Sequence, residues 1–400
     1  MPIKRRSGSS KNPPILSHEF FIQNHADIVS CVAMVFVLGL LFQATSPLAS
    51  LFVAMSHNVT DIFGDENSPA LYTYGIKDLA LTFFYFLICI VMHAVIQEYF
   101  LDVSGISSLI LNFVFLLLMF YKLNRKLHLS KIKHSKFNES GQLLIFYLLS
   151  VVWGVEIIRR EGFVLSISKL WLDYPHLQMT YLFKFYFIIQ ISYWLHSFPE
   201  LYFQKVKKEE IVSRVTYSLL YLVFFTAAYV LNFTRIALCL SVLHFFVEAL
   251  FHASRLFYFA DKTPISDYGF KLWNILFVLV RLGSITLSVL TFWYGLALHQ
   301  TAVPSLKDGN FNTNIIRINS LVAVCLLQAW MMWNFITFHL KRMREKAAEV
   351  QQQKKKSIKP QKKVKKAEDD VNELPEVDQN TKKSQITQRP VAKANKGGKH

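Results

Sequence analysis

The sequence has few of the residues and motifs on which many enzyme sites and cross-linked folds depend. Four cysteines occur among 400 residues, each inside an apolar run and none in C-x-x-C spacing. Buried thiols are therefore expected, and disulfides or zinc ligands are not. The chain also has no Gly-rich phosphate loop, no G-x-S-x-G motif and no series of closely spaced histidine pairs. Nucleotide-dependent, serine-hydrolase and di-iron chemistry are not expected, and neither is a metal or other cofactor.

Apolar residues are abundant instead. Hydrophobic residues make up 52% of the chain and aromatic residues 15%, which is typical of a polytopic membrane protein. Eight apolar runs are candidate membrane spans: residues 28–42, 79–101, 141–158, 180–198, 216–233, 236–259, 272–298 and 315–340. The sequence therefore predicts an all-α transmembrane bundle of about eight helices.

Basic residues indicate how the chain is oriented. The net charge is +17, and the first residues, alternate loops and the C-terminal tail carry most of the Lys and Arg. The positive-inside rule predicts cytosolic termini and a lumenal loop around Asn58. Asn58 begins an Asn-Val-Thr sequon and is the predicted glycosylation site. A further apolar stretch, residues 103–121, would move every later loop to the opposite side if it crossed, so a re-entrant or interfacial hairpin is expected there.

Ionisable residues inside the apolar runs are the candidate site. His244, Glu248 and His252 recur every four residues and Arg255 follows three later, so a helix would place them on one face. Because charges at membrane depth are costly, such a face is expected to meet protein or water. Residues eight apart rise about 12 Å, too far to share one metal ion. The predicted intramembrane polar face comprises His93, Gln97, Glu98, His196, Glu200, His244, Glu248, His252, Arg255 and Arg281.

Several long strings bring one family into view. They are LSHEFFIQNHADIVSCV (16–32), YGIKDLA (74–80), HAVIQEY (93–99), HSKFNESGQL (134–143), YWLHSFPELYFQK (193–205) and LHFFVEALFHASRLFYF (243–259). Together they closely resemble the translocating chain-associated membrane protein (TRAM) family over about 13–344. The resemblance implies a non-enzymatic protein of the endoplasmic reticulum membrane beside the Sec61 translocon. It would contact signal sequences and transmembrane segments of nascent secretory and membrane polypeptides.

The resemblance also divides the chain. Residues 1–27 form a cytosolic arm, and residues 28–138 contain the first two helices with the lumenal loop. Within them, 103–121 departs from the family pattern as an apolar insertion. A TLC domain, named for its TRAM, Lag and CLN members, covers 139–346. Residues 347–400 are expected to be a disordered basic cytosolic tail that attracts anionic lipids and the ribosome.

Other functions remain to be weighed, because ceramide synthases also contain a TLC domain. Those enzymes are associated with an adjacent histidine pair and a later His-Asp element that supply the acid or base for acyl transfer. Here Phe245 follows His244 in place of the aspartate, and the pair would fall near Tyr217 and Ser218. Acyl transfer is therefore not expected. A lipid-binding or lipid-sensing TLC protein and a purely structural partner stay open.

The expected mechanism is that of a membrane scaffold. The polar face would line a hydrated groove or perturb the bilayer locally, which would lower the cost of holding a weakly hydrophobic segment beside the channel. On this view, replacing His244, Glu248 and His252 with leucine leaves folding intact and impairs weak signal sequences.

Overall fold

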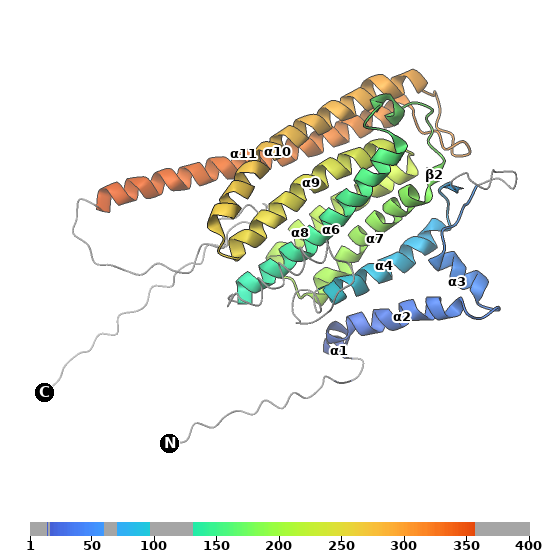
Figure 1. The fold of residues 1–400 in the computed structure, drawn as a ribbon, viewed down its shortest axis with the longest axis horizontal. Coiled ribbons are helices and arrows are strands. Elements are labelled where there is room, and N and C mark those ends of the chain that lie inside the picture. The colour runs from blue at the N-terminus through green and yellow to red at the C-terminus, as the bar shows by residue number, and fades with distance from the viewer. Residues whose placement is uncertain (1–13, 15–16, 60–69, 97–130, 357–400) are drawn as a thin grey trace.

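The computed structural model describes residues 14, 17–59, 70–96 and 131–356, which form a bundle of long helices (Figure 1). The α-helices are α1 (His18–Gln23), α2 (His25–Gly39), α3 (Ser46–Val53), α4 (Asp78–Val95), α6 (Lys131–Glu161), α7 (Tyr181–Phe203), α8 (Lys208–Val230), α9 (Thr234–Phe259), α10 (Thr263–Ser288) and α11 (Asn314–Lys356). The 3-10 helix η2 (Ile167–Leu170), the π-helix η3 (Val289–Gly295), the 3-10 helix η4 (Leu296–His299) and the antiparallel strands β1 (Leu71–Tyr72) and β2 (Met179–Thr180) complete the described elements.

Six of the described helical segments are long and apolar enough to cross a membrane. They start at or within α4, α6, α8, α9, α10 and α11. Helix α7 has 23 residues but is not among these six, and it contains Pro199 and three buried ionisable side chains. Helix α2 has only 15 residues and rises about 22 Å, less than the roughly 30 Å hydrocarbon core. The predicted all-α membrane bundle is confirmed. The expected number of about eight is reached only when α7 and the broken pair α2–α3 are added.

Helices α7 and α9 form the centre of the bundle. Helix α9 packs against α6 and α10, while α7 packs against α4 and α8. Phe187, Phe225 and Phe245, from α7, α8 and α9, are fully buried and follow one another in ring contact at 5.9 and 6.1 Å between centroids. Aromatic side chains therefore fill the space between the central helices, and the outer helices expose leucine and valine, as a lipid-facing surface requires.

The bundle has two distinct ends. The end that carries Asn58, here called the Asn58 end, is closed by β1, β2 and the loops before α7 and α11, whereas His93 marks the opposite end, the His93 end. Asn232 adopts a positive φ of 59° between α8 and α9, and its Nδ2 donates to Gly309 O at 2.7 Å. A tight turn thus joins α8 to α9. Helix α2 begins and α11 ends at the His93 end (Figure 1).

Two boundaries differ from the sequence expectations. Helix α2 ends at Gly39, before the end of the first apolar run at residue 42, and the short α3 begins at Ser46. Helix α11 has 43 residues and ends at Lys356, so regular helix continues past residue 346, where the disordered tail was expected to begin. Its Lys, Arg, Glu and Gln residues have high helix propensity, which favours this continuation. Several positions named above lie outside the described residues, namely Gln97, Glu98, the insertion at 103–121 and residues 357–400.

Candidate functional site

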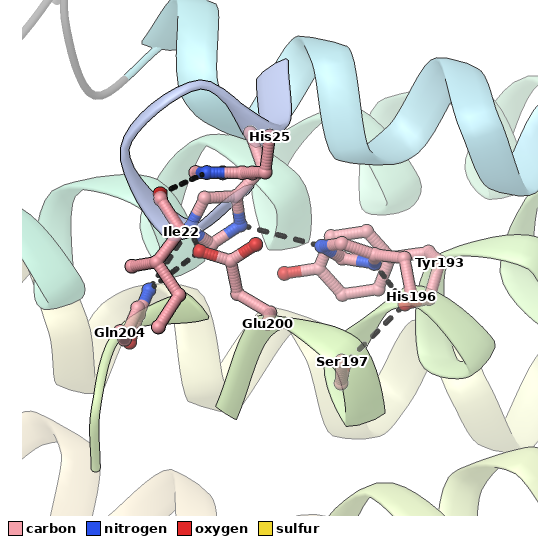
Figure 2. A network of polar contacts seen from close by, with 8 residues as sticks. Ile22, His25, Tyr193, His196, Ser197, Glu200 and Gln204 are labelled. Carbon is pink, nitrogen blue, oxygen red and sulfur yellow. Dashed lines mark hydrogen bonds and ion pairs between the residues drawn. The ribbon is translucent and has the colours of Figure 1, made fainter. Parts of the chain in front are cut away.

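A first group of polar side chains, the histidine cluster, joins α2, α4 and α7 near the His93 end (Figure 2). His93 Nδ1 lies 3.3 Å from His196 Nε2. Gln204 Nε2 donates to Glu200 Oε1 at 3.0 Å and lies 3.2 Å from His93 Nε2. His93 Nε2 and Glu200 Oε1 are 3.3 Å apart. His25, at the start of α2, stacks its ring on Phe203 at 4.3 Å, which completes the cluster.

The rings of His93 and His196 can both be neutral while each of their ring nitrogens has a hydrogen-bond partner. If Gln204 donates to His93 Nε2, then His93 Nδ1–H donates to His196 Nε2, and His196 Nδ1–H donates to the carbonyl of Tyr193. Within the described part of the chain, the second carboxylate oxygen of Glu200 has no hydrogen-bond partner although the residue is buried. The cluster therefore retains one unused acceptor.

A second group, the Arg281 network, crosses the core. Arg281 Nη1 donates to Gln328 Oε1 at 2.9 Å, and its Nη2 lies 2.7 Å from His244 Nδ1. His244 Nε2 contacts the hydroxyl of Tyr221. The hydroxyls continue from Tyr221 to Tyr217 at 3.1 Å and from Tyr217 to Tyr147 at 2.9 Å. One hydrogen-bonded path therefore connects α6, α8, α9, α10 and α11.

The chemistry of arginine fixes the direction of this path. Arginine has donors only, so His244 Nδ1 accepts from Arg281 and His244 Nε2–H donates to Tyr221. Glu248 Oε1 lies 3.8 Å from His244 Nδ1, which places a carboxylate beside the guanidinium and imidazole. Trp194 of α7 stacks on Tyr221 at 4.0 Å between ring centroids. The histidine ring is thus held on both nitrogens and the tyrosine path is packed on one face.

Most of the predicted polar residues that the structure describes fall into these two groups. His93, His196 and Glu200 meet in the histidine cluster, and His244, Glu248 and Arg281 meet in the Arg281 network. His252 stacks against Tyr147 at 5.7 Å. Arg255 lies over the rings of Phe251 and Phe259 instead, 5.7 Å from each centroid. All of these residues except His93 are more than nine-tenths buried, so they lie in helix–helix interfaces.

A buried ion pair between Lys184 and Asp78 was not anticipated from the sequence. Lys184 Nζ lies 2.7 Å from Asp78 Oδ1, with the lysine side chain fully buried. Lys184 also donates to Ser56 O and Thr73 O at 2.9 and 2.7 Å, and the hydroxyl of Tyr229 donates to Asp78 Oδ2 at 2.9 Å. The contacts tie α4, α7 and α8 to the loops at the Asn58 end. The only sequence signal is a single lysine inside the aromatic string YLFKFYF.

Two loop residues at the Asn58 end complete the description. Asn58 is exposed and pairs with Tyr72 in an isolated bridge, whereas the asparagines of the other two sequons, Asn138 and Asn232, are buried. His176 Nε2 lies 2.7 Å from Leu172 O. Burial lowers the pKa of His176 to about 4, and the nearby positive charge of Arg235 acts in the same direction. The imidazole is therefore neutral at neutral pH.

The positions that were compared with ceramide synthases lie in the core. Phe245 is fully buried and contacts the rings of Tyr147 and Phe225 at 5.2 and 6.1 Å. Tyr217, where a histidine pair would fall, belongs to the Arg281 network. An apolar ring therefore occupies the place of the expected aspartate, and a hydroxyl path occupies that of the histidine pair.

The fold and this buried polar interior define a multi-pass helical membrane protein with a TLC domain, and the TLC domain family model matches residues 136–337. The chain is 43% identical to translocating chain-associated membrane protein 2 of Mus musculus over 345 residues, 86% of each chain. It is 42% identical to the protein of that name from Homo sapiens over the same share. The chain belongs to the family of translocating chain-associated membrane proteins, which confirms the resemblance.

A more distant similarity extends to an enzyme. Ceramide synthase 4 of Bos taurus is 25% identical over 147 residues, which is 37% of this chain and 37% of that enzyme. The match to the TLC domain covers residues 136–337. It begins three residues before the expected start at 139 and ends before the expected end at 346.

Proposed function

We propose that this chain is a non-enzymatic accessory protein of the translocon in the endoplasmic reticulum membrane. It lies beside the Sec61 channel, contacts signal sequences and transmembrane segments of nascent chains, and assists their translocation or insertion. The observation that carries this proposal is the 43% identity to a translocating chain-associated membrane protein over 86% of both chains. That share is larger than the TLC domain, so the similarity includes residues outside it.

The site geometry supports a protein without acyl-transfer chemistry. A general base needs a free lone pair within reach of the substrate proton. The two nitrogens of His244 are occupied by Arg281 and Tyr221, and Phe245 supplies no proton-transfer group. Purified protein supplied with an acyl donor and an acyl acceptor is expected to form no product.

We place both termini in the cytosol and Asn58 in the lumen. Helix α2 begins and α11 ends at the same end of the bundle, which supports this arrangement, and the basic residues that follow Leu340 favour the cytosolic side. The basic tail would then face anionic lipid headgroups and the ribosome.

We place the contact with translocating segments near the histidine cluster. A groove of about 950 Å³ lies between α1 and the end of α7, lined by residues that include Ile22, Leu201, Tyr202 and Lys205. Glu200 directly precedes Leu201 in the sequence, and His25 follows Ile22 by three residues. A weakly hydrophobic or charged segment at this groove would meet both apolar and polar side chains, which lowers the cost of leaving water. The residues of the Arg281 network act at a distance, by fixing the helices.

Site-specific photocrosslinking tests the proposal. Ribosome-bound chains carry a photoreactive residue in the signal sequence and are inserted into microsomes that contain this protein. A crosslink that weakens as the signal becomes more hydrophobic, and that maps to α1 or the end of α7, is the expected result. Crosslinking in which strong and weak signals behave alike contradicts the mechanism, and absence of any crosslink contradicts the function.

A lipid-binding or lipid-sensing TLC protein is the second candidate. The observation that favours it is the 25% identity to ceramide synthase 4 of Bos taurus. This function predicts an acyl chain or sphingolipid that copurifies with the protein and survives detergent exchange, which mass spectrometry of the purified protein would detect.

A further inference from the structure

The loop that follows α6 carries apolar side chains at its tip. Gly162 has a positive φ of 73°, and the chain reverses there because glycine adopts this conformation without strain. Phe163 is buried, but the next two residues are not: Val164 is 75% exposed and Leu165 94%. Ile167, at the start of η2, is also exposed. Three large apolar side chains thus project from one short segment.

The residues on both sides of this tip are held against the ends of neighbouring helices. Arg235, in the first turn of α9, donates to Lys169 O at 2.6 Å, and its guanidinium lies 5.7 Å from the Phe163 ring centroid. The ring of Trp171 packs directly against Gly295, where a Cβ atom would come within 2.2 Å of it. Because η2 contacts η3, η2 lies beside the last turns that follow α10, and the exposed tip directly precedes η2 in the chain.

The helix surface at that level is a lipid-facing one. Trp293 and Tyr294 on η3 are 54% and 62% exposed, and Leu290 and Leu298 are exposed before and after them. Tryptophan and tyrosine at the end of a span are typical of the membrane–water interface. The apolar tip of the loop therefore continues a surface that already meets the bilayer at headgroup depth.

Charges beside the tip fit the same surroundings. Arg159 and Arg160, in the last turn of α6, expose most of their side chains, and Lys169 is exposed on the other side of the tip. Long basic side chains keep their charge at the headgroups while their stems follow apolar surface. Residues 164–168 contain no charged side chain.

We propose that residues 163–171 form an interfacial anchor, in which Val164, Leu165 and Ile167 insert into the acyl-chain boundary of the leaflet at the Asn58 end. The partner is lipid, bound through its acyl chains and flanked by its phosphates. Anchors of this kind sit about 5–10 Å below the headgroups. The anchor holds the η2 loop against η3 and fixes the depth of the bundle at this end, independently of the proposed contact with translocating segments.

Leu306 provides a matched control. It is a leucine of similar exposure, 83%, in the other large loop of the same end. Ser305 and Asn310 pair across this turn, and Ser305 Oγ donates to Asp308 Oδ2 at 2.7 Å. Lys307 and Asp308 follow Leu306 directly, and the loop extends past the ends of α10 and α11 (Figure 1). Leu306 is therefore expected to face water.

The test uses the full chain with its four cysteines replaced, reconstituted in phosphatidylcholine nanodiscs and carrying a nitroxide at Leu165→Cys or Leu306→Cys. Molecular oxygen dissolves in the acyl region, whereas a nickel complex dissolves in water. At position 165, oxygen is therefore expected to relax the nitroxide more than the nickel complex does. At position 306 the order is expected to reverse. Nickel dominating at both positions overturns the anchor, and so does shielding of position 165 from both reagents, which indicates a covering protein.

A second measurement keeps the native cysteines. It tests the proposal even if the cysteine-free chain does not fold. Leu165→Trp and Leu306→Trp are compared in nanodiscs of brominated phosphatidylcholine. Measured as the difference from the unsubstituted chain with its seven tryptophans, the emission added by the tryptophan at 165 is expected to be quenched by bromine near the headgroup. The emission added at 306 is expected to be retained. Equal quenching of the two tryptophans overturns the proposal.

Discussion

At the scale of single residues, the buried charges are specified by partners on other helices. Arg281 is 1% exposed and donates to Gln328 and His244, while Lys184 is neutralised by Asp78 and satisfied by two carbonyls. A buried charge that loses one partner is strongly destabilising, because the remaining group stays desolvated. Stability should therefore depend on these residues individually.

Replacing His244 with leucine tests this dependence. His244→Leu removes the acceptor of Arg281 Nη2 and the partner of the Tyr221 hydroxyl, so we expect a loss of about 2–4 kcal/mol in unfolding free energy. The sequence alone led to the opposite expectation, that leucine leaves folding intact. Thermal unfolding in detergent micelles measures the change. Phe246→Leu, on the lipid-facing side of the same helix, is the control, and equal midpoints for the two variants would contradict the role of the network.

His176 makes a prediction for pH. Its folded pKa is about 4, below the 6.5 of the unfolded chain, so the unfolded state binds more protons between these values and stability rises with pH there. The contribution is complete above about pH 6.5 and is lost as the pH falls toward 4, at most about 3 kcal/mol.

Thermal unfolding at about pH 7 and about pH 5 measures this contribution. His176→Gln keeps a donor for Leu172 O and has no titrating ring, so its unfolding midpoint should fall less on acidification than that of the unchanged protein. An identical fall in both proteins rules out His176 as the source.

At the scale of elements, the pair α2–α3 is attached to the bundle mainly through α4. Ala33 of α2 packs with Phe84 and Leu87 of α4 in a small apolar cluster separate from the main core. The start of α2 also reaches α7, where His25 stacks on Phe203, and α1 reaches α7 through the rings of His18 and Tyr202. Local opening follows weak packing, so α2 is expected to separate from the bundle before other helices do.

Truncation of Phe84 should increase this opening. Phe84→Ala removes a ring that is 4% exposed and lies 6.0 Å from that of Phe36, at an expected cost of about 2–4 kcal/mol to the α2–α4 interface. Hydrogen exchange along α2 should accelerate while exchange in α9 stays unchanged. The control is Leu79→Ala on the exposed side of α4; a similar acceleration there would mean that α4 itself has been weakened.

The helices were predictable from the sequence, but their contacts were not. Four-residue spacing of His244, Glu248 and His252 was enough to place them on one buried face of α9. Their partners Tyr147, Tyr221 and Arg281 lie on α6, α8 and α10. The rotation of each of these helices about its own axis depends on packing, which leaves no local pattern in the sequence. Asp78 and Lys184 are likewise distant in sequence. Because an unpaired lysine is costly to bury, Lys184 in an apolar string implies a partner, but the sequence does not say which residue it is.

At the scale of the whole molecule, the orientation in the membrane is testable through Asn58. A lumenal Asn58 is expected to carry an N-linked glycan that endoglycosidase removes, and Asn58→Gln should abolish the corresponding mobility shift on electrophoresis. Asn138→Gln serves as the control, because Asn138 is buried near the start of α6. A shift that persists in Asn58→Gln and disappears in Asn138→Gln would reverse the orientation.

The length of α11 has a consequence of its own. Its 43 residues rise about 65 Å, roughly twice the 30 Å hydrocarbon core. From Lys341 onward its described side chains are exposed and rich in charge. The part of α11 after Leu340 thus extends about 24 Å beyond the bundle as one continuous helix. Its length sets the distance between the membrane surface and Lys356, where the described helix ends.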